Sequence, residues 1–155
     1  MTGGDLSVLV QYAVDEPGTP APAFFEDCAR RVFGDVAGEL VVRVVDAKES
    51  AFLNERYRGE RGPTNVLAFD GGELPLGEAG HRPFGDLAIC AAVVAREAEE
   101  QGKSLGAHWA HIVIHGCLHL VGYDHETEAG AAEMEARERD LLGGLGIADP
   151  YVVGA

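Results

Sequence analysis

Three histidines near the C-terminal third of the chain have the residue type and spacing of a metal site. His115 and His119 are four residues apart, which on a helix places both imidazoles on one face, one turn from each other. Gly122 can end that helix in a left-handed conformation, so that the chain folds back and brings His125 to the same point. Three neutral imidazoles with a fourth position left for water are typical of catalytic zinc. The pattern therefore predicts one Zn2+ per chain, on a C-terminal helix and its exit turn.

The residues around these histidines are apolar on nearly every side, which is typical of a buried helix. A solvated polar helix face fits this context poorly, because a buried imidazole without a partner costs free energy. His111 lies on the same face and is interpreted either as a support for a ligand or as a core residue. Asp124, next to His125, is interpreted either as a carboxylate that orients an imidazole or as a turn-capping residue.

The length of 155 residues predicts a single domain, 1–155, which is large enough to bury a stable hydrophobic core. The three cysteines are odd in number and far apart, which favours reduced thiols in the cytoplasm over a disulfide framework. The apolar segment Leu6–Val14 lacks the basic start of a signal peptide, and no run of apolar residues is long enough to cross a membrane. A cytoplasmic protein without a membrane partner is therefore expected.

The formal net charge of −14 speaks against nucleic-acid binding over the whole surface, because such surfaces are usually basic. The basic residues nevertheless cluster between positions 43 and 61, where Arg56, Arg58 and Arg61 lie close together in sequence. A local basic cleft on an acidic body is therefore possible. The acidic residues within 97–100 and 126–140 are expected to form solvated helix faces.

The elements that must position these side chains can be read from hydrophobic periodicity and from start and stop residues. Strands are expected at Leu6–Val14, Glu39–Asp46, Asn65–Phe69 and Gly85–Ile89. Helices are expected at Ala21–Phe33, from Asp46 to about Tyr57, and at Cys90–Gln101, Leu105–Val121 and Thr127–Leu142. The segment Gly71–Arg82 is expected to be a mobile loop, and the Gly-rich tail 143–155 is expected to fray. The result is an α+β fold, close to α/β, with a small mixed sheet of about four strands packed with five or so helices.

The histidine spacing also matches the zinc motif of metzincin peptidases. Those enzymes need a glutamate directly after the first histidine, as general base for the attacking water. Gly116 stands there, and a glycine can neither hold nor move a proton. A peptidase is therefore disfavoured, while metal binding itself is not.

The segment His115–His125 closely resembles the signature of the YbeY family of bacterial endoribonucleases. The resemblance extends in order over a large part of the chain, through Leu53–Gly59, Pro63–Phe69, Gly85–Ile89 and His108–His111. This ordered set of segments is far more specific than three histidines alone.

The resemblance implies a zinc-dependent endoribonuclease, specific for single-stranded RNA, that acts in 16S rRNA 3′ end maturation, rRNA processing and ribosome quality control. The implied partners are ribosomal RNA and the small ribosomal subunit or its assembly factors, and DNA is not expected. His115 and Arg58 are implied as catalytic groups, with Arg58 opposite the metal to hold a phosphate in a bidentate fork. Arg56 and Arg61 are expected to bind substrate.

Two other functions remain open at this point. One is a metallohydrolase acting on another substrate class, such as a peptidase. The other is a non-catalytic ribosome-assembly factor with structural zinc, against which the three evident ligands count, because structural sites usually have four.

Overall fold

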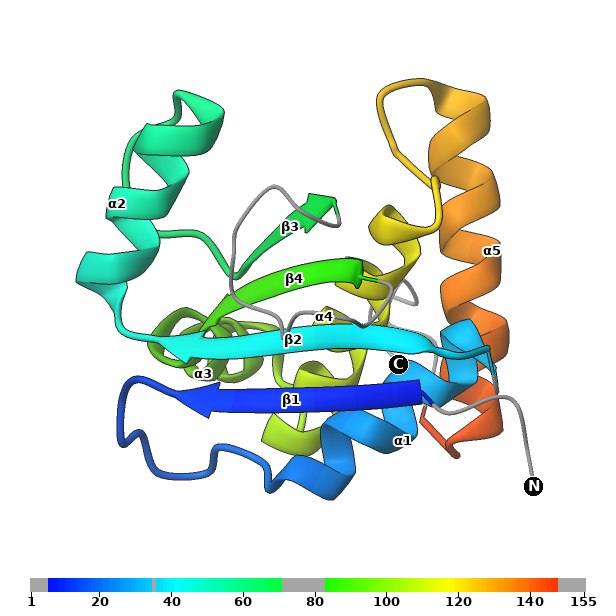
Figure 1. Ribbon diagram of the computed structural model, residues 1–155, viewed down its shortest axis with the longest axis horizontal. Coiled ribbons are helices and arrows are strands. Elements are labelled where there is room, and N and C mark those ends of the chain that lie inside the picture. Colours follow the sequence, from blue (N-terminus) through cyan, green and yellow to red (C-terminus); the bar gives the residue numbers. More distant parts are fainter. Residues whose placement is uncertain (1–5, 35, 71–82, 148–155) are drawn as a thin grey trace.

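A four-stranded mixed sheet forms the centre of the computed structural model, which describes residues 6–34, 36–70 and 83–147 (Figure 1). The strands are β1 (Leu6–Tyr12), β2 (Gly38–Val45), β3 (Val66–Asp70) and β4 (Pro83–Cys90). Their order in the sheet is β1-β2-β4-β3. Strands β1, β2 and β4 run parallel, and β3 pairs antiparallel with β4. The sheet is therefore mixed, as the α+β prediction required, and β3 is one of its two edge strands.

Five helices pack around this sheet in the described part of the chain. They are α1 (Pro22–Phe33), α2 (Ala47–Arg58), α3 (Ala91–Gln101), α4 (Leu105–Leu120) and α5 (Glu128–Gly144). Helix α4 contacts the sheet, α1, α3 and α5, and passes behind the sheet in Figure 1. It is thus the central helix of the main core, in agreement with its apolar sequence.

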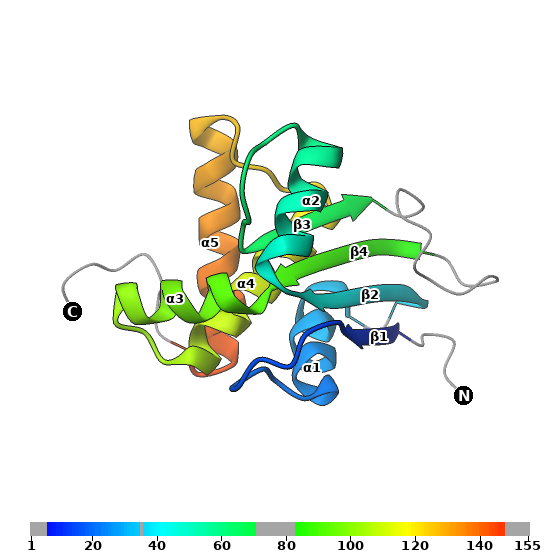
Figure 2. The same ribbon diagram turned by 90° about the vertical axis from the view of Figure 1, so that its left-hand side faces the viewer.

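The two faces of the sheet carry different helices. Leu87 and Ile89 of β4 belong to the main core, together with Trp109 and the rest of the apolar face of α4. Ala88, on the alternate face, packs with Leu67 and Phe69 of β3 and with Leu53 of α2. Strands β3 and β4 therefore lie between α2 and α4. In the side view, α2 lies in front of these strands (Figure 2).

Helix α4 approaches the sheet so closely that a side chain at position 116 would crowd two residues of the sheet. A Cβ on Gly116 would lie 2.9 Å from Leu87 Cδ2 and 3.1 Å from Val66 Cγ2. Gly116 therefore lets the histidine helix pack directly on β3 and β4. A glutamate at this position would collide with both side chains, so the packing explains Gly116 without reference to catalysis.

The exit turn of α4 has the hydrogen bonds of a Schellman motif. Gly122 N–H donates to the His119 carbonyl at 3.1 Å, and Tyr123 N–H donates to the Leu118 carbonyl at 3.1 Å. Gly122 has a φ of +102°, in the region that L side chains rarely adopt. The expected left-handed glycine at this helix end is present, and it directs the chain back toward the helix.

Each expected strand and helix is present in the described residues, and the ends differ from the predicted ones by at most a few residues. The predicted fraying of the tail is wrong for residues 143–147. Helix α5 continues to Gly144, Ile147 N–H donates to the Leu142 carbonyl at 2.9 Å, and Leu145 and Ile147 pack against the core. Residues 148–155, and the loop 71–82 that was predicted to be mobile, lie outside the described residues. Within the described ranges, none of the helices has the length and apolarity needed to cross a membrane.

Candidate metal centre

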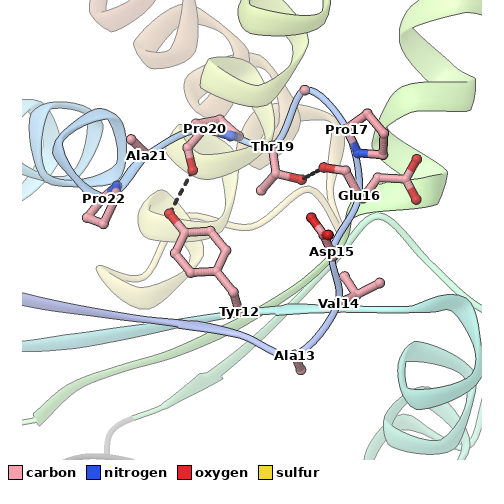
Figure 3. Close-up of a pocket in the computed structure, with 11 residues that line it drawn as sticks. Tyr12, Ala13, Val14, Asp15, Glu16, Pro17, Thr19, Pro20, Ala21 and Pro22 are labelled. Carbon is pink, nitrogen blue, oxygen red and sulfur yellow. Dashed lines mark hydrogen bonds between the residues drawn. The ribbon is translucent and has the colours of Figure 1, made fainter.

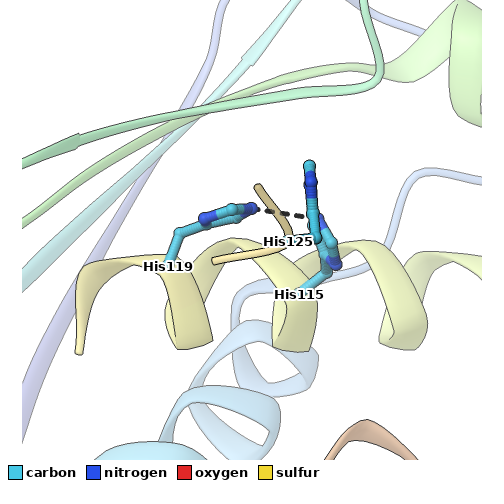
Figure 4. A group of neighbouring side chains, drawn as sticks. All are labelled: His115, His119 and His125. Carbon is cyan, nitrogen blue, oxygen red and sulfur yellow. Dashed lines mark hydrogen bonds between the residues drawn. The ribbon is translucent and has the colours of Figure 1, made fainter. Parts of the chain in front are cut away.

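The structure brings His115, His119 and His125 together at the end of α4 (Figure 4). One side-chain nitrogen from each ring lies within 4.8 Å of the other two. The Nε2 atoms of His115 and His119 are 3.2 Å apart. The centroid of the His125 ring lies 5.6 Å from that of His115 and 5.2 Å from that of His119. The i,i+4 spacing aligns the first two rings, and the Schellman turn returns the third.

The separation of the first two nitrogens suits a shared metal ion. Two nitrogens that each lie 2.0–2.1 Å from a tetrahedral zinc ion are about 3.3 Å apart. The His115 and His119 Nε2 atoms, at 3.2 Å, have nearly this separation. His115 and His119 are partly buried and His125 is exposed, so the group is open to solvent on one side. The three imidazoles therefore fit a metal ion with an open coordination position.

The surroundings of His119 favour the neutral imidazole that a metal requires. Burial lowers the pKa of His119 below its ordinary value of 6.5, and the neighbouring His115 and His125 lower it further. A hydrogen bond with the Tyr123 backbone and the charge of Glu138 act in the opposite direction. These shifts favour the neutral ring, which is the form that binds a metal ion without releasing a proton.

A carboxylate that the sequence interpretation missed lies directly behind the metal group. Glu138 of α5 is 0% exposed, and its Oε2 lies 2.6 Å from His115 Nδ1 and 3.6 Å from His111 Nε2. The expectation that 126–140 forms a solvated face is therefore wrong at this residue. The sequence did carry a signal, because Glu138 stands in the buried stripe of α5 between Met134 and Leu142.

The two interpretations of Asp124 and His111 can now be compared with their contacts. Asp124 is exposed, and its Oδ1 accepts a hydrogen bond from Glu126 N–H at 3.1 Å, which is the contact expected of a turn-capping residue. His111 lies 3.6 Å from Glu138 and is mostly buried. His111 thus lies beside the carboxylate that contacts His115 and is also packed in the interior, so its position agrees with both interpretations, a support for a ligand and a core residue.

A second cluster of polar side chains, formed by His108, Glu97 and Asn65, lies about one helical turn before His111. His108 is 2% exposed and its Nε2 lies 2.9 Å from Glu97 Oε1. Asn65 donates to the same carboxylate oxygen at 3.1 Å and so connects α3 and α4 to the start of β3. Burial lowers the pKa of His108, while the hydrogen bond to Glu97 opposes that shift. Glu97 was expected on a solvated face, but it is a structural partner of a buried histidine.

Arg58 ends α2 and is held on strand β3. Its Nη2 donates to the Ala68 carbonyl at 2.6 Å, and its guanidinium carbon lies 4.7 Å from the ring centroid of Phe69. Val66, at the other end of β3, packs against Gly116, the neighbour of His115. Arg58 and the histidine helix therefore approach the same edge strand, one over the face that carries α2 and the other over the opposite face.

The two other arginines with expected roles are also exposed. Arg56 lies with its guanidinium carbon 5.7 Å from the ring of Tyr57, and Arg61 follows in the loop after α2. Neither is part of the histidine group. The three candidate ligands thus come from α4 and its exit turn, whereas the arginines lie at the C-terminal end of α2 and in the loop after it.

Two surface hollows lie away from the rings of the three candidate ligands. One hollow is lined by the loop between β1 and α1, from Tyr12 to Pro22 (Figure 3). In this loop the Tyr12 hydroxyl donates to the Pro20 carbonyl and the Thr19 hydroxyl donates to the Glu16 carbonyl, each at 2.7 Å. The other is formed by the exit turn of α4 and the first turns of α5, from Val121 to Glu133. Only the second adjoins a candidate ligand, His125, so the donor chemistry identifies the site better than surface shape.

A mixed sheet packed with helices, three imidazoles that could hold a metal ion on a helix and its exit turn, and a carboxylate behind the first of them form the arrangement expected of a metal-dependent hydrolase. The sequence model of the family described as Endoribonuclease YbeY matches residues 23–146. The chain belongs to the YbeY family, and the resemblance found in its sequence is confirmed.

Individual relatives agree with this assignment. Endoribonuclease YbeY of Stenotrophomonas maltophilia strain R551-3 is 49% identical over 151 residues, which cover 94% of this chain and 93% of the relative. The protein of the same name from Xanthomonas axonopodis pv. citri is 50% identical over 151 residues with the same coverage. The solution structure of TM1509 from Thermotoga maritima has a TM-score of 0.54 and 24% identity, with 90% of this chain and 91% of that chain covered, and it supports the fold.

Proposed function

We propose that this chain is an endoribonuclease that cleaves single-stranded RNA with one zinc ion held by His115, His119 and His125. Membership of the YbeY family supports the nuclease activity, because the relatives at 49–50% identity carry that name. The observation that carries the metal assignment is the 3.2 Å separation of the His115 and His119 Nε2 atoms, with His125 returned to them by the exit turn. We place its action in the cytoplasm, in 16S rRNA 3′ end maturation and ribosome quality control, with the small ribosomal subunit or its assembly factors as partners.

The chemistry divides between the ion and the chain. A bound zinc ion would lower the pKa of water to about 7 and polarise a phosphoryl oxygen. His115, His119 and His125 would hold the ion through ring nitrogens, and the open side of the group at the exposed His125 would admit water and substrate. Arg58 is exposed and carries the fork geometry that binds two phosphate oxygens, so it is assigned to phosphate binding and to stabilising the charge that develops there.

The exposed surface of α2 suits a single strand. Phe52 and Tyr57 are 63% and 38% exposed, and Arg56 lies beside the Tyr57 ring. Aromatic rings interleaved with arginines bind single strands, because bases stack on the rings and phosphates pair with the cations. A duplex hides the faces of its bases and gains less from this surface. We assign Arg56 and Arg61 to the phosphate backbone next to the cleaved bond.

A peptidase is opposed by the packing of Gly116. The glutamate that such an enzyme needs at this position would overlap Leu87 and Val66. A purely structural zinc is opposed by the exposure of His125 and by the three-residue donor group found in the described residues.

The test is to incubate the zinc-loaded protein with single-stranded RNA, duplex RNA and casein. The wild type should cleave only the single strand, and His119→Ala should lose both zinc binding and cleavage. Asp140→Asn, an exposed change on α5 outside the hollow beside His125, serves as the control and should behave as the wild type. Casein cleavage, or undiminished RNA cleavage by His119→Ala, would contradict the proposal.

A further inference from the structure

Glu138 is a fully buried carboxylate in an apolar setting. It lies on the face of α5 that also carries Met134, Leu141 and Leu142, which are 1%, 7% and 0% exposed. A carboxylate in such a position is costly unless its oxygens are hydrogen-bonded or paired. Its Oε2 lies 2.6 Å from His115 Nδ1. A buried acid that faces a candidate metal ligand needs an explanation beyond packing.

We infer that Glu138 is a positioning residue for the metal centre: its carboxylate fixes the ring and the tautomer of His115, so that Nε2 is the free nitrogen. The inference rests on the proposed metal site and adds the group that prepares it.

The chemistry of the contact decides which nitrogen is protonated. In the inferred arrangement Glu138 is an ionised carboxylate, which can only accept hydrogen bonds, so the Nδ1 of His115 donates to it. In the neutral ring, the second nitrogen then carries a lone pair. That second nitrogen is Nε2, which faces Nε2 of His119 at 3.2 Å. A single contact 23 residues away in sequence therefore aims the lone pair of His115 at the point where the ion is proposed to lie.

His111 supports the carboxylate from the same helix as His115. Its Nε2 lies 3.6 Å from the Glu138 Oε2 atom that His115 contacts. The two rings are one helical turn apart, so the carboxylate lies against both of them and cannot turn away without leaving both. Glu138 is thus held in place by α4, and it holds His115 in return.

The same three groups, His111, His115 and Glu138, could instead bind a second ion, since their ligand atoms lie within 4.8 Å of one another. That ion would use Nδ1 of His115 while the first ion uses Nε2, so His115 would have to lose both ring protons. A hydrogen bond at 2.6 Å needs no such ionisation and accounts for the geometry as it stands. The orienting role is therefore preferred.

The experiment compares Glu138→Gln and Glu138→Leu with the exposed control Asp140→Asn on the same helix. Zinc affinity is measured by competition with a chelator, the number of ions per chain by elemental analysis, and the tautomer of His115 by long-range proton–nitrogen NMR of the metal-free protein. The wild type should bind one ion and show the Nδ1–H tautomer. Both Glu138 variants should bind zinc roughly 10–100-fold more weakly, and Glu138→Leu should show a mixture of tautomers. The control should match the wild type.

Three results would overturn the inference. These are an Nε2–H tautomer of His115 in the wild type, unchanged zinc affinity in folded Glu138→Gln, or two zinc ions per wild-type chain with one in the variant. The tautomer measurement needs only the wild type, so the inference stays testable even where a variant fails to fold. Cleavage of RNA is a separate readout: a wild type that binds zinc through an oriented His115 but leaves RNA intact would contradict the proposed function and not the role of Glu138.

Discussion

At the scale of single residues, the side chains in and around the candidate metal site have different roles. The histidines offer nitrogens for an ion, Glu138 faces one of them from behind, and Arg58 lies across the edge strand β3. Because these groups belong to different elements, substitutions can be chosen that disturb one duty and leave the others intact.

Arg58→Ala should depress cleavage of single-stranded RNA by roughly 100-fold, the usual loss when a donor to a developing charge is removed. Zinc content and melting temperature should stay nearly the same, because the side chain is exposed and the contacts described for it are with the carbonyls of Tyr57 and Ala68 and with the Phe69 ring. Arg58→Lys should recover part of the rate, since it supplies a charge without the fork. Arg96→Ala, at an exposed position on α3, is the control; full activity in Arg58→Ala would reduce Arg58 to a surface residue.

The protonation of His108 should make the metal-free protein less stable in mild acid. Burial places the folded-state pKa of His108 below 6.5, the value of the free ring, so the unfolded chain binds the proton more readily. The free energy of unfolding should therefore fall as the pH drops below about 6.5. Urea unfolding at pH 7.5 and 5.5 should show a smaller difference for His108→Gln than for the wild type. An equal difference in both proteins would assign the effect elsewhere, for example to His119, whose pKa is shifted in the same direction.

At the scale of elements, α4 must pack closely on the sheet and must also end in a turn that returns the chain, and a glycine serves each requirement. Gly116 lets the helix pack on β3 and β4, and Gly122 ends it in a turn that returns His125. The same helix therefore contributes to the main core and carries two of the three candidate ligands. Each of these two glycines can be compared with a control glycine in a similar backbone position that lacks the contact or the ligand in question.

Gly116→Ala should destabilise the protein by about 1–3 kcal/mol, because the new Cβ would overlap Leu87 in a packed core. Gly106→Ala, in the same helix but with open space around its Cα, should be neutral or stabilising by up to about 1 kcal/mol. Equilibrium urea unfolding measures both. Equal effects at the two positions would show that helix propensity, rather than the approach to the sheet, determines the result.

Gly122→Ala should weaken zinc binding roughly tenfold and cost about 1–2 kcal/mol of stability, because an alanine resists the positive φ and shifts the exit turn. Gly102→Ala forces the same kind of strain at the end of α3, where φ is +66°, but no candidate ligand follows it. It should lose similar stability and keep its zinc affinity. Equal zinc affinities for the two variants would separate the turn from the metal site.

At the scale of the whole molecule, the core and the metal centre are distinct. The main core consists of apolar residues from the sheet, α1, α3, α4 and α5, and it contains none of the three candidate ligands. The fold should therefore persist without metal, in contrast to small zinc domains that unfold when the ion is removed.

Chelation of the zinc-loaded protein should lower its melting temperature by roughly 10 °C while the far-ultraviolet circular dichroism at 25 °C stays that of a folded protein. The shift follows from the loss of about 4 kcal/mol of binding free energy when the free ion had been at a thousand times its dissociation constant. Readdition of zinc should restore the melting temperature in the wild type and not in His119→Ala. Loss of secondary structure on chelation would instead make the ion part of the core.

The sequence by itself determined the features that depend on neighbours along the chain. The i,i+4 spacing of His115 and His119, the left-handed Gly122 and the strand and helix segments are local, since each is set by periodicity or by the conformational preference of one residue. Tertiary structure alone decided the strand order, the contact of Gly116 with Leu87, and the pairing of Glu138 with His115. These depend on which faces meet after folding. A glutamate among solvated charges and a glutamate aimed at a partly buried imidazole are the same letter in the sequence, and only the packing of α5 on α4 distinguishes them.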